Sequence, residues 1–558
     1  VLGSATLRDA AFGTLWSALA VTVLALTGAT AAALVIERSP RRLRRWMRIG
    51  VLLPLLLPPF VSALSWVTAY GPGGLVDDVV SVTMPGLFGP VGVVVVVTVN
   101  ALPLAYLIVA AALATRADAD LELAARNAGA DSATVLRTIT LPALRPALVG
   151  AGALVFVVAI NAFGIPAILG TPSGFSTVTT RIYRDLAFSA DPEAFSRVLV
   201  LAALLVFVTL MVVGAADATA GSRRRPLHRV ETPSALPPSP RRRDRIALAV
   251  VGVYALVATI VPLLALVLMA LTRAVGLTPT PGNWTTANFA EAWSGGTWRA
   301  MGNSVVISAT AALVVLFLAG GLILAERKLA ARPLGTVAAL SFAVPGSALA
   351  VAMLLAYGPW LRDTVLLILV AYLAKFWALG HRPLAGAATS LSADVVWAAR
   401  ISGADRSTAL RTIVVPLLRP AVIAAWLLVF LFGLHELTMS SLLYGPDTAT
   451  LAVVTLNVQQ LGDATVTSAL AVGLTGIVAL AAVPLGWVWR SWTRLWRRYR
   501  HHYVSYGMAN ARRWRRHHYR VSRRYAMANR DKVTFGWIVF LEILFVIRGR
   551  FRRLIFDA

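Results

Sequence analysis

The chain contains no cysteine, and only 14% of its 558 residues are charged. The first absence excludes disulfides, thiolate metal sites and cysteine nucleophiles. The second excludes an ordinary soluble domain, in which about 25% of residues are charged. The phosphate-loop motif G-x-x-x-x-G-K-[ST] and the hydrolase motifs G-x-S-x-G and H-E-x-x-H are absent as well. The sequence therefore gives no sign of a self-sufficient ATPase or hydrolase.

Hydrophobic residues make up 58% of the chain and recur in long runs. A run of about 20 apolar residues is the length that an α-helix needs to cross a bilayer, whereas a barrel strand needs only about ten. The pattern therefore predicts an all-α, polytopic membrane protein with eleven spans. The predicted spans are 12–36, 50–70, 91–114, 147–169, 195–216, 246–272, 304–325, 335–358, 364–388, 420–443 and 466–489.

The net charge of +27 is unevenly distributed along the chain. Residues 490–558 hold 18 Lys and Arg against three acidic residues, and six arginines lie between Arg38 and Arg48. Loops rich in Lys and Arg face the cytoplasm. One alternation then places the N-terminus outside and the loop 115–146 inside, as expected for a multi-pass membrane protein.

A stretch rich in Pro, Ser and Arg at 217–245 predicts a cytoplasmic linker. We expect a first half at 1–216 with five spans, a second half at 246–489 with six spans, and a basic cytoplasmic tail at 490–558. The first half has no counterpart of the span 246–272, and the chain begins with Val. A truncated or shortened opening of the first half is therefore expected.

The strongest signal is a polar segment that occurs twice. Residues 124–146 read AARNAGADSATVLRTITLPALRP and residues 398–420 read AARISGADRSTALRTIVVPLLRP, which agree at 15 of 23 positions. Each copy has a glycine suited to a left-handed helix cap and an aspartate suited to cap the next helix. The pattern predicts two short helices at an angle. Two docking surfaces for one kind of partner are the favoured interpretation, and an ordinary connector is the alternative.

The pattern AA-x3-G-x9-I-x-x-P, followed by LRP, resembles the EAA loop of type I ABC importer permeases. The matching residues and their capping neighbours are Ala124, Ala125, Gly129, Ala130, Asp131, Ile139 and Pro142 in the first copy and Ala398, Ala399, Gly403, Ala404, Asp405, Ile413 and Pro416 in the second. The resemblance implies the two-half permease fold, with each loop docked on one of two ABC ATP-binding subunits. It also implies an external solute-binding protein, with ATP and Mg on the partner subunits and no cofactor on this chain.

The chain departs from this family at the acidic position of the loop, where Leu123 and Trp397 stand. Glu122 comes one residue early in the first copy, and Asp394 comes three residues early in the second. The contribution of charge to docking is therefore expected to differ between the two copies.

Two segments after the loops, 161–183 and 435–457, resemble the corresponding stretch of ferric-iron permeases. Ferric iron is the solute that this resemblance favours. Thiamine, aminoethylphosphonate and polyamine permeases share much of the pattern and stay open as alternatives. An alternative from another class is a polytopic membrane scaffold or enzyme whose basic tail recruits partners.

Polar residues within predicted spans are candidates for a solute pathway, because they are costly in a membrane. Asn161 and His435 match at the offset of 274 residues, and Glu436 follows His435. We expect these three to face the central pathway or its outer gate, with Glu436 attracting a cation. A hydrogen-bonded set that holds helices together is the alternative. Asn100 and Lys375 are weaker candidates, and no spacing of His, Asp or Glu in the spans predicts a metal site.

The tail 490–558 alternates Arg with Tyr and Trp. A basic surface that binds anionic lipid is the favoured interpretation, and an RNA-binding segment or a paired-histidine metal site are the alternatives. The apolar run 533–547 is short for a span, so we expect an interfacial helix there.

Overall fold

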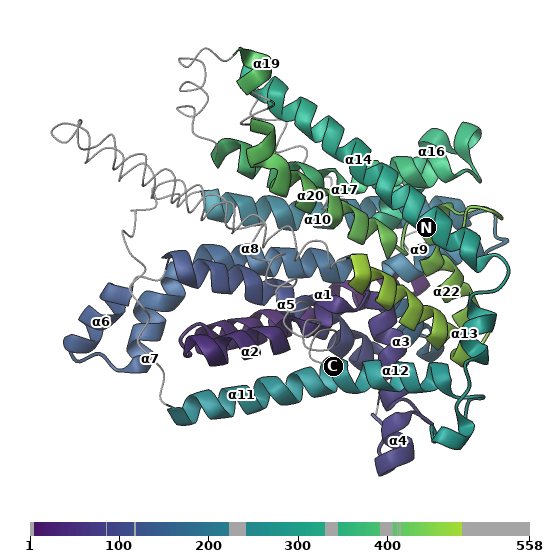
Figure 1. Ribbon diagram of the computed structural model, residues 1–558, viewed down its shortest axis with the longest axis horizontal. Helices are drawn as coiled ribbons and strands as arrows, with labels where there is room; N and C mark the ends of the chain where they lie inside the picture. Colours follow the sequence, from purple (N-terminus) through teal and green to yellow (C-terminus); the bar gives the residue numbers. More distant parts are fainter. Residues whose placement is uncertain are drawn as a thin grey trace.

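A computed structural model describes residues 5–84, 86–116, 119–221, 241–329, 344–390, 405–409, 411 and 414–481. Every regular element in these ranges is helical (Figure 1). Among the described residues, nine helices are long and apolar enough to cross a membrane, or ten if one bent pair counts as a span. The predicted all-α membrane fold is therefore confirmed. Residues 222–240 of the predicted linker and the whole tail 490–558 lie outside the described residues.

The first half contains ten α-helices, joined in places by tighter or wider helical turns. The α-helices are α1 (Ala5–Ile36), α2 (Arg41–Leu52), α3 (Pro59–Tyr70), α4 (Leu75–Val80), α5 (Pro90–Arg116), α6 (Ala119–Asn127), α7 (Ser132–Val135), α8 (Leu141–Ile160), α9 (Val178–Ala187) and α10 (Ala194–Gly221). The turns that matter here are η1 (Leu53–Leu56), η2 (Leu136–Thr140) and η3 (Pro166–Gly170).

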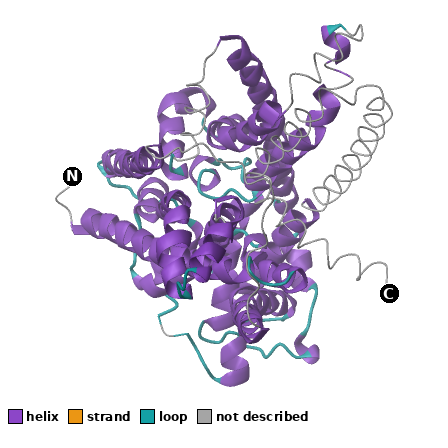
Figure 2. Ribbon diagram, turned by 90° about the vertical axis from the view of Figure 1, so that its left-hand side faces the viewer, coloured by secondary structure: helices purple, strands orange, loops and turns teal. Residues whose placement is uncertain are grey.

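The second half begins with a long opening helix that the first half has no equivalent of. Its elements are α11 (Arg241–Ala255), η5 (Leu256–Ile260), α12 (Val261–Leu271), α13 (Ala287–Ala292), α14 (Thr297–Leu329), α16 (Gly346–Leu361), α17 (Val365–Ser390), α19 (Arg406–Ala409), α20 (Val415–Leu434), α21 (Ser440–Leu443) and α22 (Leu451–Gln460), followed by the helix Ala464–Ala481. Figure 2 looks along many of these helices and shows them packed side by side.

Three predicted spans have different boundaries in the structure. The spans predicted at 147–169 and 420–443 are the helices Ser132–Ile160 and Val415–Leu434, which begin and end earlier. The span predicted at 50–70 is a pair of helical segments bent by 98°. The bend lies at Leu57, which is extended (φ −96°, ψ 129°) because the following Pro58 disfavours a helical conformation there. Of the span predicted at 335–358, residues 335–343 lie outside the described ranges.

The two halves share a contact between α1, or its equivalent α14 in the second half, and a short helix that follows the repeated loop in the sequence. In the first half, the hydroxyl of Thr14 accepts a hydrogen bond from the N–H of Val178 at the start of α9 (2.8 Å). In the second half, the hydroxyl of Ser304 accepts one from the N–H of Leu451 at the start of α22 (2.8 Å). A helix start leaves its first N–H groups without intrahelical partners, so each hydroxyl satisfies one of them in a buried setting.

The opening helix of the second half has two backbone carbonyls without their usual helical donors. Pro262 has no N–H group, so the carbonyl of Ala258, four residues earlier, receives no bond from it. The wide turn η5 directs the N–H of Val261 to the carbonyl of Leu256 instead of Val257. Both free carbonyls lie in a predicted span, where water is not present to satisfy them.

Two aromatic side chains of α3, in the first half, donate to these carbonyls. Trp66 Nε1 donates to Ala258 O at 3.3 Å. The Tyr70 hydroxyl donates to Val257 O at 2.6 Å. The opening helix of the second half is therefore bonded to the first half, and α11 likewise packs against α2. These contacts interlock the two halves.

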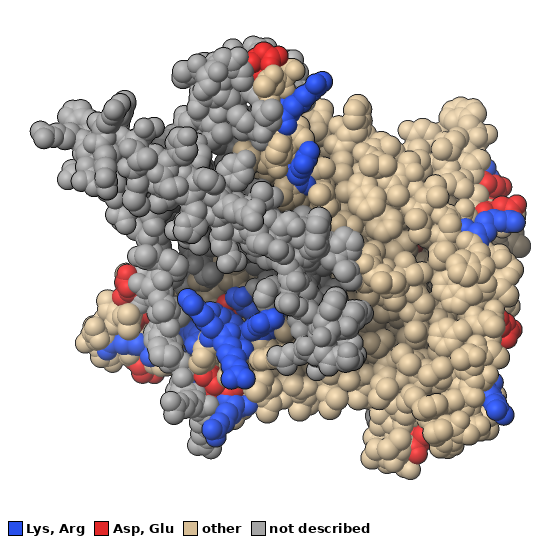
Figure 3. Space-filling view, viewed as in Figure 1, with Lys and Arg blue, Asp and Glu red and all other residues tan. Residues whose placement is uncertain are grey.

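Both repeated loops lie at the same end of the helices. In Figure 1, α6 and α7 are on the left, and α19 is at the top, beside the end of α14 that points away from α13. Charged side chains in Figure 3 gather toward the two ends, and the surface between them is nearly free of charge in this view. An uncharged belt between charged ends is the surface that a bilayer requires.

We expect Trp66→Phe to lower the stability of the protein in detergent by about 1 kcal/mol, because the substitution leaves a buried carbonyl unpaired. Thermal unfolding of the purified protein measures this. Pro262→Ala is the matched background, since it restores an N–H to the carbonyl of Ala258. Trp66→Phe should then cost clearly less, and equal costs in both backgrounds would contradict the pairing.

Candidate functional site

The first repeated loop forms a compact hairpin of α6, α7 and η2, which we call the docking hairpin (residues 119–140). Its turn depends on Gly129, which has a φ of +92° with no neighbouring atom near the position of a side chain. The N–H groups of Gly129 and Ala130 donate to the carbonyls of Arg126 and Ala125, both at 2.9 Å. Glycine is needed here for its left-handed backbone and not for space.

An aspartate begins the second helix of each repeated loop, as predicted. Asp131 accepts a hydrogen bond from the N–H of Thr134 at 3.0 Å. Asp405 accepts the same bond from Thr408, also at 3.0 Å. Hydrogen bonding to Thr134 and to Thr408 lowers the pKa of the respective carboxyl below its ordinary 3.8. The shared cap gives both loops the same local shape at this position.

The structure places the predicted docking residues of the first copy along the surface of the hairpin. Ala124, Gly129, Asp131 and Pro142 are exposed, and Ala125, Ala130 and Ile139 are half-buried. In the second copy, Asp405 is exposed and Pro416 is half-buried. The remaining predicted residues, Ala398, Ala399, Gly403, Ala404 and Ile413, lie outside the described residues.

Two leucines of α6 are exposed, whereas its one glutamate faces inward. Leu121 and Leu123 are 56% and 41% exposed, whereas Glu122 is fully buried. Its carboxylate binds Arg38 Nη2 at 2.8 and 3.1 Å and accepts a bond from the Thr140 hydroxyl at 2.6 Å. The displaced acidic residue is thus not available on the exposed face of α6.

The turn between α1 and α2 carries three consecutive polar residues, which contact four side chains on other helices. Glu37 binds Arg48 of α2 at 2.5 Å and accepts a bond from the Tyr106 hydroxyl of α5 at 2.8 Å. Arg38 binds Glu122, as described above. The Ser39 hydroxyl donates to Asp244 of α11 at 2.8 Å. This turn, which we call the α1–α2 corner (Glu37, Arg38 and Ser39), therefore joins four other helices.

The predicted pathway residues lie where α8 and α20 end. Asn161 and His435 directly follow these helices, and both are half-buried. Asn161 Oδ1 and His435 Nδ1 are buried atoms without a hydrogen-bond partner in the described part of the chain. The matched pair thus carries buried polar atoms at equivalent places in the two halves.

Glu436 stabilises the start of α21. Its carboxylate accepts bonds from the N–H groups of Met439 (2.9 Å) and Ser440 (3.0 Å) and from the Ser440 hydroxyl (3.1 Å). Lys375 of α17 interacts with it electrostatically and donates to the carbonyl of Val344. In the first half, Asn100 of α5 donates to the Ser62 hydroxyl of α3 at 3.0 Å.

The chain segments that follow α8 and α20 meet at the boundary between the halves. A side chain at Gly164 would lie 2.5 Å from Phe60 and 3.3 Å from Leu437 of the second half. Tyr183 of α9 also accepts a bond from Gln460 of α22, at 3.4 Å. The structure therefore brings the loops that carry Asn161 and Glu436 to one interface.

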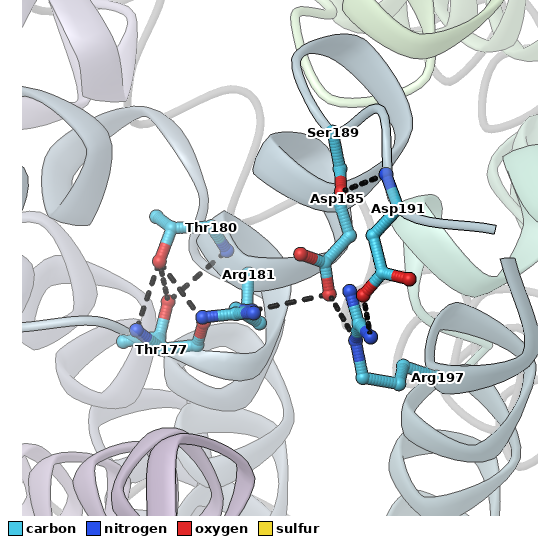
Figure 4. A network of polar contacts seen from close by, with 7 residues as sticks. All are labelled: Thr177, Thr180, Arg181, Asp185, Ser189, Asp191 and Arg197. Atoms are coloured by element: carbon cyan, nitrogen blue, oxygen red, sulfur yellow. Dashed lines mark hydrogen bonds and ion pairs between the residues drawn. The ribbon is translucent and has the colours of Figure 1, made fainter. Parts of the chain in front are cut away.

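A charged network ties α9 to α10 in the first half (Figure 4). Asp185, which is buried, binds Arg181 at 3.1 Å and Arg197 at 3.6 Å, and Arg197 also binds Asp191 at 2.5 Å. Thr177 and Thr180 form a capping box at the start of α9. The network fixes the helix whose Tyr183 reaches the second half.

Sequence reasoning missed the α1–α2 corner and the inward direction of Glu122. A comparison of the two copies could have revealed the pairing of Glu122 with Thr140, because these residues correspond to Val396 and Val414. Both partners of one hydrogen bond are apolar in the second copy. Within the described ranges, no group of three His, Asp or Glu residues is placed to hold a metal ion.

Comparison with known proteins agrees with this architecture. A family model for the binding-protein-dependent transport system inner membrane component matches residues 15–224 and 318–491, which together make up more than half of the chain. The molybdenum transport system permease ModB of Mycobacterium tuberculosis is 35% identical over 201 residues, covering 35% of this chain and 74% of that protein.

Two longer relatives align with most of the chain. The probable ABC transporter permease y4fN of Sinorhizobium fredii is 24% identical over 476 residues, which cover 81% of this chain and 82% of that protein. The Fe(3+)-transport system permease FbpB 2 of Haemophilus influenzae is 24% identical over 443 residues, which cover 78% and 80%.

The two aspartate caps predict a defined pH response. Because hydrogen bonding lowers the carboxyl pKa in the fold, each cap contributes fully above the unfolded pKa and is lost as the pH falls through the folded value. We expect the amides of Thr134 and Thr408 to exchange faster after Asp131→Ala and Asp405→Ala, as measured by hydrogen exchange. Asn substitutions are the control, since Asn also caps helices but does not titrate. Protection that keeps its acid sensitivity in the Asn variants would contradict this assignment.

Proposed function

The chain belongs to the family of binding-protein-dependent transport system inner membrane components, and from this premise we propose that it is the transmembrane permease subunit of an ATP-driven importer. Its apolar helices and its relatives make it a multi-pass protein of the bacterial inner membrane. As a transport subunit, it would move solute while a separate subunit hydrolyses ATP.

The observation that carries the proposal is the repeated loop at one end of the helices. The first copy is a hairpin whose exposed residues on α6 include Leu121, Leu123 and Ala124. The second copy repeats the Asp405 cap at the same end. Two similar loops on one side of the membrane suit two copies of an ATP-binding subunit, which would carry ATP and Mg.

The solute that we propose is ferric iron. The Fe(3+)-transport permease FbpB 2 aligns with about four fifths of this chain, whereas the molybdenum permease aligns with about one third of it. Thiamine, aminoethylphosphonate and polyamines are the alternatives. In each case an external binding protein would deliver the solute to the face that carries α4 and α13.

We place the pathway at the interface where the loops after α8 and α20 meet. Asn161 and His435 supply matched polar atoms there, and Glu436 supplies one carboxylate. Because Glu436 is held by the start of α21, its charge is fixed in position and would act on a passing cation without moving. The close approach of Gly164 to Leu437 supports this placement.

The chain with its candidate ATPase and binding protein, reconstituted in vesicles, should take up ferric iron in a reaction that needs ATP and binding protein. Uptake of labelled iron, molybdate and thiamine distinguishes the solutes. We expect Gly129→Val to abolish co-purification of one ATPase copy, because β-branched residues are strained at positive φ.

Gly150→Val is the control for this test, because Gly150 lies in α8 with open space around it. It should leave the complex intact. If the native chain bound no ATPase and the basic tail recruited other proteins, the scaffold alternative would hold instead. Uptake of molybdate or thiamine without iron would retain the importer but overturn the solute.

Glu436→Gln should reduce iron uptake at least about fivefold if its charge attracts the cation, since one lost charge contact is worth about 1–3 kcal/mol. Gln can still accept from the N–H of Met439, so the fold is expected to persist. Normal uptake by a stable Glu436→Gln protein would remove the pathway role and leave Glu436 as a structural cap.

A further inference from the structure

We propose that Glu122 is a positioning residue that transmits movement of the docking hairpin to α1 through a buried clamp of Arg38, Glu122 and Thr140. This inference rests on the proposed function, since it concerns how force from a docked ATPase would reach the membrane helices. The clamp is a contact within this chain, and Glu122 does not touch the partner in this arrangement.

The clamp closes the base of the docking hairpin. Glu122 lies in the first turn of α6, and Thr140 is the last residue of η2, just before α8. The bond of 2.6 Å between them joins two positions 18 residues apart. The exposed tip of the hairpin, with Gly129 and Asp131, projects away from this base (Figure 1). Because this bond joins the two ends of the hairpin, a force on the tip would move both ends together.

The same carboxylate ties the hairpin to the end of α1. Arg38 Nη2 contacts both oxygens of Glu122, and the two side chains are 13% and 0% exposed. A buried ion pair of this kind is hard to open, because either partner alone would be a buried charge. Arg38 follows the C-terminal end of α1, where a cation is favourable, and Glu122 is near the N-terminal end of α6, where an anion is favourable.

The α1–α2 corner extends the connection to other helices. Glu37 contacts Arg48 of α2 and Tyr106 of α5, and Ser39 contacts Asp244 of α11. These contacts flank Arg38 in the sequence, so a displacement of Arg38 is shared with its neighbours. Because α11 belongs to the second half, movement of the first hairpin would reach both halves of the protein.

The second copy of the loop lacks both ends of this clamp. Val396 stands in the place of Glu122, and Val414 in the place of Thr140. The carboxylate and the hydroxyl that bond to each other are thus both apolar in the second copy. Both polar residues are replaced by valine in the second copy, as expected if the two residues act as a pair. We infer that the first docking site is the one connected by charge to the membrane helices.

The test compares coupling with assembly in the reconstituted importer. We expect Glu122→Gln to lower the solute moved per ATP hydrolysed about tenfold, with ATPase binding and basal ATP hydrolysis unchanged. Thr140→Val, which copies the second loop, should lower the same ratio about threefold. The charge exchange Arg38→Glu with Glu122→Arg should recover most of the coupling, which a general loss of packing would not allow.

Two controls separate the clamp from charge and volume in general. Arg42→Gln removes a charge from an exposed position of α2 and should leave the ratio unchanged, and so should Thr140→Ser, which keeps the hydroxyl. Normal coupling in Glu122→Gln, or an equal loss in Arg42→Gln, would overturn the inference. If Glu122→Gln instead abolished ATPase binding, Glu122 would act in docking and the clamp role would also be wrong.

The native protein distinguishes this inference from the proposed function. If the native chain neither binds an ATPase nor transports solute, the importer assignment itself fails. If it does both and the Glu122 variants behave normally, only the clamp fails.

Discussion

The bilayer provides no water for unpaired backbone groups, and this constraint explains most of the architecture. It explains why the spans are helices. It also explains why the unpaired backbone groups at each helix break bond to side chains. Thr14 and Ser304 supply hydroxyls to helix starts, and Trp66 supplies a donor where Pro262 removes one. These polar side chains inside the protein therefore form hydrogen bonds with backbone groups at helix starts and helix breaks. A solute pathway can use only polar groups that are not already bonded in this way.

The two halves repeat one design but connect to their docking loops differently. In the first half, a buried charge links the loop to the membrane helices. In the second half, the equivalent positions are valines. The halves also differ at one matched position of the candidate pathway, where Asn161 corresponds to His435.

The sequence was sufficient to predict the class of fold, most of the spans and the shape of the repeated loop. The length of an apolar run is enough to identify a membrane span. Gly129 and Asp131 shape the turn and cap the next helix through contacts with residues close by in the sequence, so a short segment is enough to predict them. The boundaries at Ile160 and Leu434 were wrong, because apolar residues continue past both helix ends and hydropathy does not register the break. The Arg38–Glu122 pair was not foreseen, because its partners are 84 residues apart and their contact depends on packing.

The interlocking of the halves has a consequence for biosynthesis. Trp66 and its acceptor Ala258 are separated by 192 residues, and chains grow at about 5–20 residues per second, so roughly 10–40 s pass before α3 meets its partner. During that time the indole N–H of Trp66 lacks its final acceptor, and the first half waits in the membrane with one face uncovered. The first half therefore reaches its final packing only after the opening helix of the second half has been inserted into the membrane.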